Sequence, residues 1–320
     1  MVKIRLLLFV LFSLIPILLI VTLFSNNLGL NSGSSESLGT LRNLSGLTSV
    51  KRKNLVTVIL GGDVMLGRSV MAVSSDKGDA LYPFRKISAY LSTADAVLFN
   101  LENPIIENCP INYQGMVFCA HPQMLQGLVA SSVNIVNIAN NHILDYGFDG
   151  YEETKKHLEE NGILYFGGND YLVYEFSGLK FGFVGFNKAQ IMKPSLTQDE
   201  RKLIISVRKM ADVLIVSMHW GVEYQPRALP GIKKLAHELA ELGADVVWGH
   251  HPHWVQNVER IGESSVFYSL GNLVFDQMWS EETREGIMVK LVFEDGRIVK
   301  EEFIKTYMKE WAQPELVDDK

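Results

Sequence analysis

DVVWGHHPHWVQ, residues 245–256, joins a short apolar run to a cluster of three histidines, His250, His251 and His253. The chain has only eight histidines in all, and Pro252 keeps His251 and His253 off a regular helix. A short β-branched run that ends abruptly in polar residues is typical of a buried strand whose carboxyl end faces a ligand. We interpret this segment as a strand followed by a loop that carries a site.

The same unit of apolar run and polar cluster occurs at five other places in the chain. The runs are LVTVIL (55–60), AVLF (96–99), NIVNIA (134–139), DVLIVSM (212–218) and SVFYSL (265–270), and they pass into GGD, NLENP, NNHILDYG, HWGVEY and GNLVFD. Residues 150–162 and 231–243 have helical periodicity, and residues 171–186 and 286–304 are typical of β-hairpins with Ser-Gly and Asp-Gly turns. The alternation predicts a layered α/β fold.

The six polar clusters are expected to meet at one edge, because ligands bind outside the carboxyl ends of strands in α/β sheets. They supply oxygen and imidazole groups without thiolates, a set that suits Mn, Zn or Fe as one or two ions. Each cluster alone also fits a helix cap, a turn or a hydrogen-bonded histidine, and the histidines together could serve the fold alone. Three histidines within four residues favour a metal site.

Six motifs in order, GGDVMLGR, NLENPI, ANNHILDYG, SMHWGVEYQ, GHHPHWVQ and YSLGNLVFDQ, resemble the CapA-type poly-γ-glutamate capsule biosynthesis proteins. That family is related to the calcineurin-like metallophosphoesterases. The resemblance runs from about residue 56 to near the C-terminus. It implies a four-layer α/β/β/α sandwich of the metallophosphoesterase-like type over residues 55–320, with a divalent metal site at the strand ends.

The resemblance also implies roles for individual residues. The metal ligands would be Asp63, Glu102, Asn141, His219, His251 and His253, and the catalytic residues His142, as acid or base, and Asp145. The strand-end clusters themselves predict substrate contacts from Asn100, Asn140, Glu223, His250 and Asn272. Arg68 could hold an anion, because a guanidinium group matches carboxylate or phosphate oxygens, or it could be a surface arginine. Two departures from the pattern leave one or two ions open: Met65 stands where the pattern has a histidine, and Glu102 where it has an aspartate. His250 could replace His251 as ligand, although His251 with His253 keeps the His-x-His spacing.

The N-terminal part of the sequence predicts a membrane anchor. Residues 6–24 are uncharged and long enough to span a bilayer, and Lys3 and Arg5 favour a cytoplasmic segment at 1–5. A cleaved signal peptide is the alternative. Residues 25–54, rich in Ser, Asn and Gly, predict a flexible stalk. We therefore expect a single-pass protein of the cell membrane with an extracytoplasmic main domain. In that domain Cys109 and Cys119 are expected to form a disulfide, with two separate buried thiols as the alternative.

These expectations lead to two functional hypotheses. The first is a metal-dependent hydrolase that acts on an anionic envelope substrate. The second is a non-catalytic accessory subunit that binds a polymer such as poly-γ-glutamate beside membrane synthase or export subunits. The formal net charge of −6 argues against a nucleic-acid partner.

Overall fold

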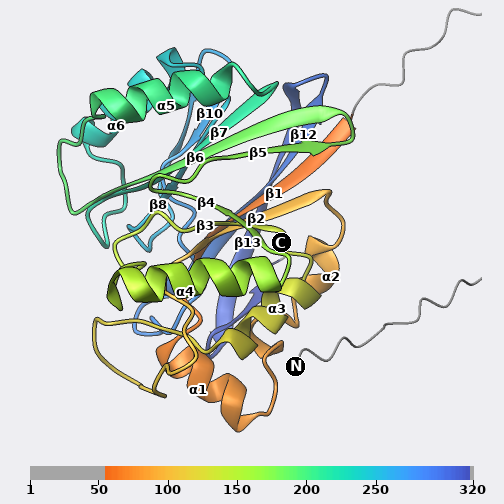
Figure 1. Cartoon of the computed structure of the whole chain (residues 1–320), viewed down its shortest axis with the longest axis vertical. Coiled ribbons are helices and arrows are strands. Elements are labelled where there is room, and N and C mark those ends of the chain that lie inside the picture. Colours follow the sequence, from red (N-terminus) through yellow and green to blue (C-terminus); the bar gives the residue numbers. More distant parts are fainter. Residues whose placement is uncertain (1–54, 318–320) are drawn as a thin grey trace, which may run out of the picture. The chain divides into compact units, whose positions relative to one another are not determined.

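The computed structural model describes residues 55–317, which form two β-sheets with helices against their outer faces (Figure 1). The predicted α/β class is confirmed. The predicted anchor at 6–24 and stalk at 25–54 lie outside the described residues. Among residues 55–317, every helix is too short or too polar to cross a bilayer.

The first sheet has eight strands. The parallel strands β1 to β4 form one half, and antiparallel strands continue from β1 on its other side. In spatial order the strands are β14 (Gln313–Leu316), β13 (Arg297–Glu310), β12 (Glu285–Glu294), β1 (Leu55–Val64), β2 (Ala96–Leu101), β3 (Ile135–Asn137) and β4 (Leu164–Phe166), while β11 (Asn272–Val274) pairs with the end of β1.

The second sheet has six strands, of which the four central ones are parallel. In spatial order they are β5 (Leu172–Phe176), β6 (Leu179–Ala189), β7 (Val213–Gly221), β8 (Val246–His250), β10 (Ser264–Phe267) and β9 (Val258–Ile261). Both predicted hairpins are present, as β5–β6 and β12–β13. Their turns place Ser177–Gly178 and Asp295–Gly296 at positive φ, as the Ser-Gly and Asp-Gly pairs predict.

Three apolar cores separate four layers of helix, sheet, sheet and helix. One core lies between the two sheets, and the other two lie under helices on the outer faces. Figure 1 shows α5 and α6 beside the second sheet, and α1 to α4 on the side of the first. The helices are α1 (Arg68–Asp76), α2 (Ser88–Leu91), α3 (Leu125–Ala130), α4 (Gly147–Glu160), α5 (Gln198–Arg208), α6 (Pro230–Glu241) and α7 (Glu281–Arg284), with 3-10 turns η1 (Tyr82–Phe84) and η2 (Pro122–Met124).

Several strands run further than their apolar sequence predicts. Asp63, Asn100, His219 and His250 are expected after their strands, but all four lie within them. The reason is pairing: Asp63 is in register with Asn100, and His219 with His250, so the backbone stays extended beyond the last apolar residue. The polar side chains therefore stand on rigid strand ends, which fixes their positions better than a loop would.

Gly62 allows β1 to reach this edge. A Cβ atom at residue 62 would lie 2.0 Å from the carbonyl oxygen of Gly271, so only glycine permits the contact. The next residue, Asp63, then donates its backbone N–H to the same oxygen at 3.0 Å. The close approach joins β1 to the segment before β11 and brings Asn272 opposite Asp63.

Candidate metal centre

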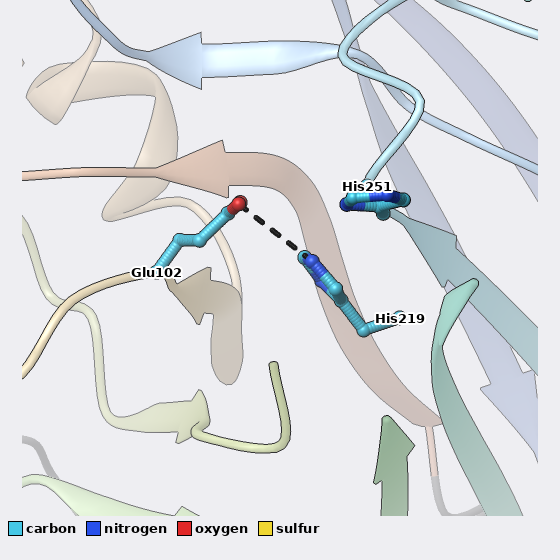
Figure 2. Close-up of side chains that lie close together, drawn as sticks. All are labelled: Glu102, His219 and His251. Carbon is cyan, nitrogen blue, oxygen red and sulfur yellow. Dashed lines mark ion pairs between the residues drawn. The ribbon is translucent and has the colours of Figure 1, made fainter. Parts of the chain in front are cut away.

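Glu102 is the carboxylate on which the two sheets converge. It follows β2, is wholly buried, and its Oε1 atom has no hydrogen-bond partner within residues 55–317. Oε1 lies 3.6 Å from Nε2 of His219 and 3.8 Å from Nε2 of His253, both from the second sheet and its loops. Figure 2 shows Glu102 and His219 pointing toward one another, with His251 beside them.

Five of the predicted ligands, together with Glu223, form three groups in which the candidate ligand atoms lie within 4.8 Å of one another. The groups are Glu102–His219–His251, Asp63–Glu102–His253 and Glu223–His251–His253. Glu102 belongs to two of them, as a carboxylate between two ions would. Asn141 extends the first group, because its Oδ1 lies 2.6 Å from Nε2 of His219. The six residues predicted as metal ligands are thus brought together.

His251 gives the most direct test of whether a metal fits. Its side chain is wholly buried, and neither ring nitrogen has a hydrogen-bond partner within the described part of the chain. A buried polar atom without a partner destabilises the fold by about 1–3 kcal/mol. His251 also holds a φ of +94°, which orients its ring despite backbone strain. Imidazole and carboxylate donors with unsatisfied atoms suit a divalent ion such as Mn, Zn or Fe.

Asn100, predicted as a substrate contact, lies against both central carboxylates. Its Nδ2 lies 2.9 Å from Oδ1 of Asp63 and 3.4 Å from Oε2 of Glu102, so one amide group orients both carboxylates. Its Oδ1 accepts from Asn137 at 2.8 Å and from Asn140 at 3.4 Å. Asn137 was not predicted as a site residue, although a polar residue inside the apolar run NIVNIA is a usable signal.

Asn272 and His250 hold other members of the cluster in place. Oδ1 of Asn272 lies 2.9 Å from Nδ1 of His253, which leaves Nε2 of that ring toward Glu102. Nδ1 of His250 lies 3.1 Å from Oδ1 of Asp63. His250 is the last residue of β8 and lies outside the three groups, whereas His251 belongs to two of them. Such outer contacts fix the orientation of metal ligands.

His142 and Asp145 form a second unit next to this cluster. Nδ1 of His142 lies 2.8 Å from Oδ2 of Asp145. The ring of Phe118 stacks on His142 with centroids 3.8 Å apart, and its backbone N–H donates to Asp145 at 2.7 Å. Phe118 was missed because no feature of its local sequence marks it. It sits in a loop closed by the Cys109–Cys119 disulfide, which confirms that predicted pairing.

Arg68 is already engaged within the protein. Its Nε donates to Asp276 at 3.1 Å, its Nη1 donates to the carbonyl of Gly115 at 2.6 Å, and its Nη2 also pairs with Asp276. The guanidinium carbon lies 4.3 Å from the ring centre of Phe118. Arg68 therefore supports the wall behind His142, and a substrate anion would have to compete with Asp276 for it.

The pKa values of the two central carboxylates, Asp63 and Glu102, are shifted in opposite directions. Burial alone raises the pKa of Asp63, but its contacts with His250 and His253 outweigh this and hold the pKa well below its usual value. Burial, together with the charges of Asp63 and Glu223, raises the pKa of Glu102 well above its usual value. A bound cation would offset both the burial and the neighbouring negative charges, and so would favour the ionised form of Glu102.

His251 should make the metal-free protein sensitive to acid. Burial lowers its pKa to about 3, against 6.5 for an ordinary histidine, so the unfolded chain binds a proton between these values and the folded chain does not. Folding stability contributed by neutral His251 is therefore lost as pH falls below 6.5, by about 1.4 kcal/mol per pH unit. Urea unfolding with a chelator at several pH values should show this slope relative to His251→Gln. Parallel curves for the two proteins would contradict it.

The sequence of this chain is similar to those of known bacterial capsule and polymer synthesis proteins. The protein family described as "Bacterial capsule synthesis protein PGA_cap" matches residues 57–277 of this chain. The capsule biosynthesis protein CapA of Bacillus anthracis is 30% identical over an alignment 267 residues long, which covers 75% of this chain and 64% of that protein. This chain thus spans a little under two thirds of that relative. A "Probable polyglutamine synthesis accessory protein" of Mycobacterium tuberculosis is 27% identical over 285 residues, covering 70% of this chain and 75% of the relative.

A solved structure agrees with the fold. The crystal structure of a novel phosphatase from Mycoplasma pneumoniae superposes with a TM-score of 0.53 at 14% identity, covering 79% of this chain and 94% of that one. At this identity the likeness concerns the fold alone. The family match covers all the candidate ligands, from Asp63 to His253. The chain belongs to the bacterial capsule synthesis protein family PGA_cap.

Proposed function

We propose that this protein is a metal-dependent hydrolase of capsule or poly-γ-glutamate biosynthesis, acting at the cell surface on an anionic envelope substrate. Residues 6–24 would anchor it in the membrane, and residues 25–54 would carry the domain away from the bilayer. The observation that carries the proposal is buried Glu102, shared by two groups of candidate ligands and lacking a hydrogen-bond partner for Oε1 within residues 55–317.

The protein would supply ligands for one or two divalent ions. Asp63, Glu102 and His253 would hold one, and Glu102, Asn141, His219 and His251 the other. A bound ion would polarise a phosphoryl or carbonyl oxygen and lower the pKa of a bound water. The amides of Asn100 and Asn272 would keep Asp63, Glu102 and His253 oriented throughout.

His142 would transfer the proton to the leaving group. Asp145 holds Nδ1 of His142 at 2.8 Å, which fixes the tautomer and makes Nε2 the atom that exchanges a proton with the substrate. Phe118 covers one face of the imidazole and limits its rotation. A ring restrained in this way meets the substrate in one orientation, which is the purpose of the third member in catalytic triads.

The test is hydrolysis by the full chain, purified in detergent and loaded with Mn²⁺ or Zn²⁺, on model phosphoesters and γ-glutamyl peptides. We expect turnover of one substrate class that stops when a chelator is added and returns with metal. Elemental analysis of the same preparation counts bound ions. An absence of turnover on both classes, together with an absence of bound metal, would rule the proposal out.

The name of one relative favours a second candidate function, an accessory subunit that binds polymer without cleaving it. The Mycobacterium tuberculosis relative is named as a synthesis accessory protein. In that role the histidine-rich edge would bind polymer carboxylates through metal. The two functions differ for His142→Ala, because removing a proton donor abolishes hydrolysis but leaves polymer binding and export intact. Export that survives His142→Ala but is lost in His253→Ala would favour the accessory role.

A further inference from the structure

The strand that carries Asp63 supplies a single candidate ligand. A third group at the same edge, Glu223–His251–His253, contains Glu223, a residue that was not predicted as a metal ligand. Met65, two residues after Asp63, cannot add one. Its side chain is wholly buried in the core beneath the helices, and its sulfur lies 3.1 Å from the backbone nitrogen of Gly67. A further ligand must come from another element.

Glu223 is carried to this place by the loop after β7. Gly221 at φ +81° and Tyr224 at φ +58° turn the chain on either side of it. The backbone N–H of Tyr224 donates to the carbonyl of Pro252 at 2.8 Å, which ties this loop to the one that holds His251 and His253. Glu223 is half-buried, and its carboxylate lies within 4.8 Å of a ring nitrogen of each of those histidines.

The histidines on either side of Pro252 supply a second, independent indication of a bound ion. Both ring nitrogens of His251 are buried without partners among the described residues, so the Glu223 carboxylate faces donors that no hydrogen bond satisfies. His253 is shared between the Glu223 group and the Asp63–Glu102 group. A carboxylate placed beside two imidazoles suits a cation better than it suits an anionic substrate.

We propose that Glu223 is a metal ligand that binds an ion together with His251 and His253. This inference rests on the proposed metal-dependent function and replaces the substrate contact expected for Glu223 from the sequence. The carboxylate of Glu223 adds an oxygen donor to the two imidazoles, which shifts the preference of this group from Zn²⁺ toward Mn²⁺. The residue therefore sets which metal this centre selects.

The test is metal binding by the full chain, measured by titration calorimetry and by elemental analysis after dialysis. Glu223→Gln keeps the shape of the side chain and removes its charge. We expect one of the two ions to bind Mn²⁺ at least about tenfold more weakly, with the other unchanged. Glu223→His should restore a ligand and shift the preference of that centre toward Zn²⁺. Glu263→Gln, an exposed acid in the β9–β10 turn, is the matched control and should behave as the parent.

The outcomes separate this inference from the function on which it rests. A parent that binds two ions, with Glu223→Gln binding both equally well, overturns the ligand role and leaves the metal-dependent function standing. If Glu223→Gln raises only KM, Glu223 contacts substrate and the inference is wrong. A parent that binds no metal overturns both. Melting curves without metal should coincide for the parent, Glu223→Gln and Glu263→Gln, since Glu223 is half-buried in a surface loop.

Discussion

Glu102→Gln is expected to abolish the binding of both ions and to reduce hydrolysis by at least about 100-fold. Glu102 is the one residue shared by the Asp63–His253 group and the His219–His251 group. An amide cannot supply a negative oxygen to two cations, so both centres lose their common ligand at once. The loss should exceed the 10- to 100-fold effects typical of groups that only orient ligands. Elemental analysis and initial rates measure the two quantities.

Glu107→Gln is the matched control for that prediction. Glu107 lies five residues further along the same segment, and its side chain is 59% exposed. It should retain both ions and full activity. If Glu102→Gln instead loses one ion and keeps the other at parental affinity, Glu102 belongs to a single centre. The two groups would then not share their ligand.

His142→Ala is expected to lower kcat by about 100- to 10,000-fold while leaving the metal content unchanged, since a positioned proton donor contributes about that much. His142 lies outside the three candidate ligand groups and is held by Asp145 and Phe118. A substrate whose leaving group needs no proton should be hydrolysed nearly as fast by the variant as by the parent. Rates on p-nitrophenyl and alkyl esters measure this difference.

His237→Ala is the control for His142, because His237 is an exposed histidine on α6 that contacts Glu259. It should leave kcat and metal content unchanged. A His142→Ala protein that loses bound metal would show that His142 is a ligand. Equal losses on substrates with good and poor leaving groups would show that it does not act as a proton donor.

The sequence predicted the fold well because burial dominates its strands. Runs such as LVTVIL and DVLIVSM must be covered on both faces, which requires layers on either side. The positions of the candidate ligands followed from the same pattern, since parallel strands bring their carboxyl ends to one edge. Strand lengths were underestimated, because pairing between Asp63 and Asn100 continues where the apolar pattern has stopped.

The partners of individual side chains could not be predicted from the sequence. Arg68 and Asp276 are 208 residues apart and meet only because β11 returns beside β1. The same holds for Phe118, whose contact with His142 depends on the path of a loop without regular structure. Local patterns state which groups reach the edge of a sheet, whereas long-range packing decides which groups each of them contacts.

The division of the ligands between the two sheets has a consequence for the whole domain. Asp63 and Glu102 belong to the first sheet, while His219, His251 and His253 belong to the second. The apolar core between the sheets therefore sets the spacing of the two half-sites, and the indole N–H of Trp248 reinforces it by donating to the carbonyl of Gly61 at 2.9 Å. Core packing and metal affinity would thereby be coupled: each ion bound at the proposed site would act as a cross-link that raises the melting temperature, and substitutions deep in the interior would change the affinity without touching the ion.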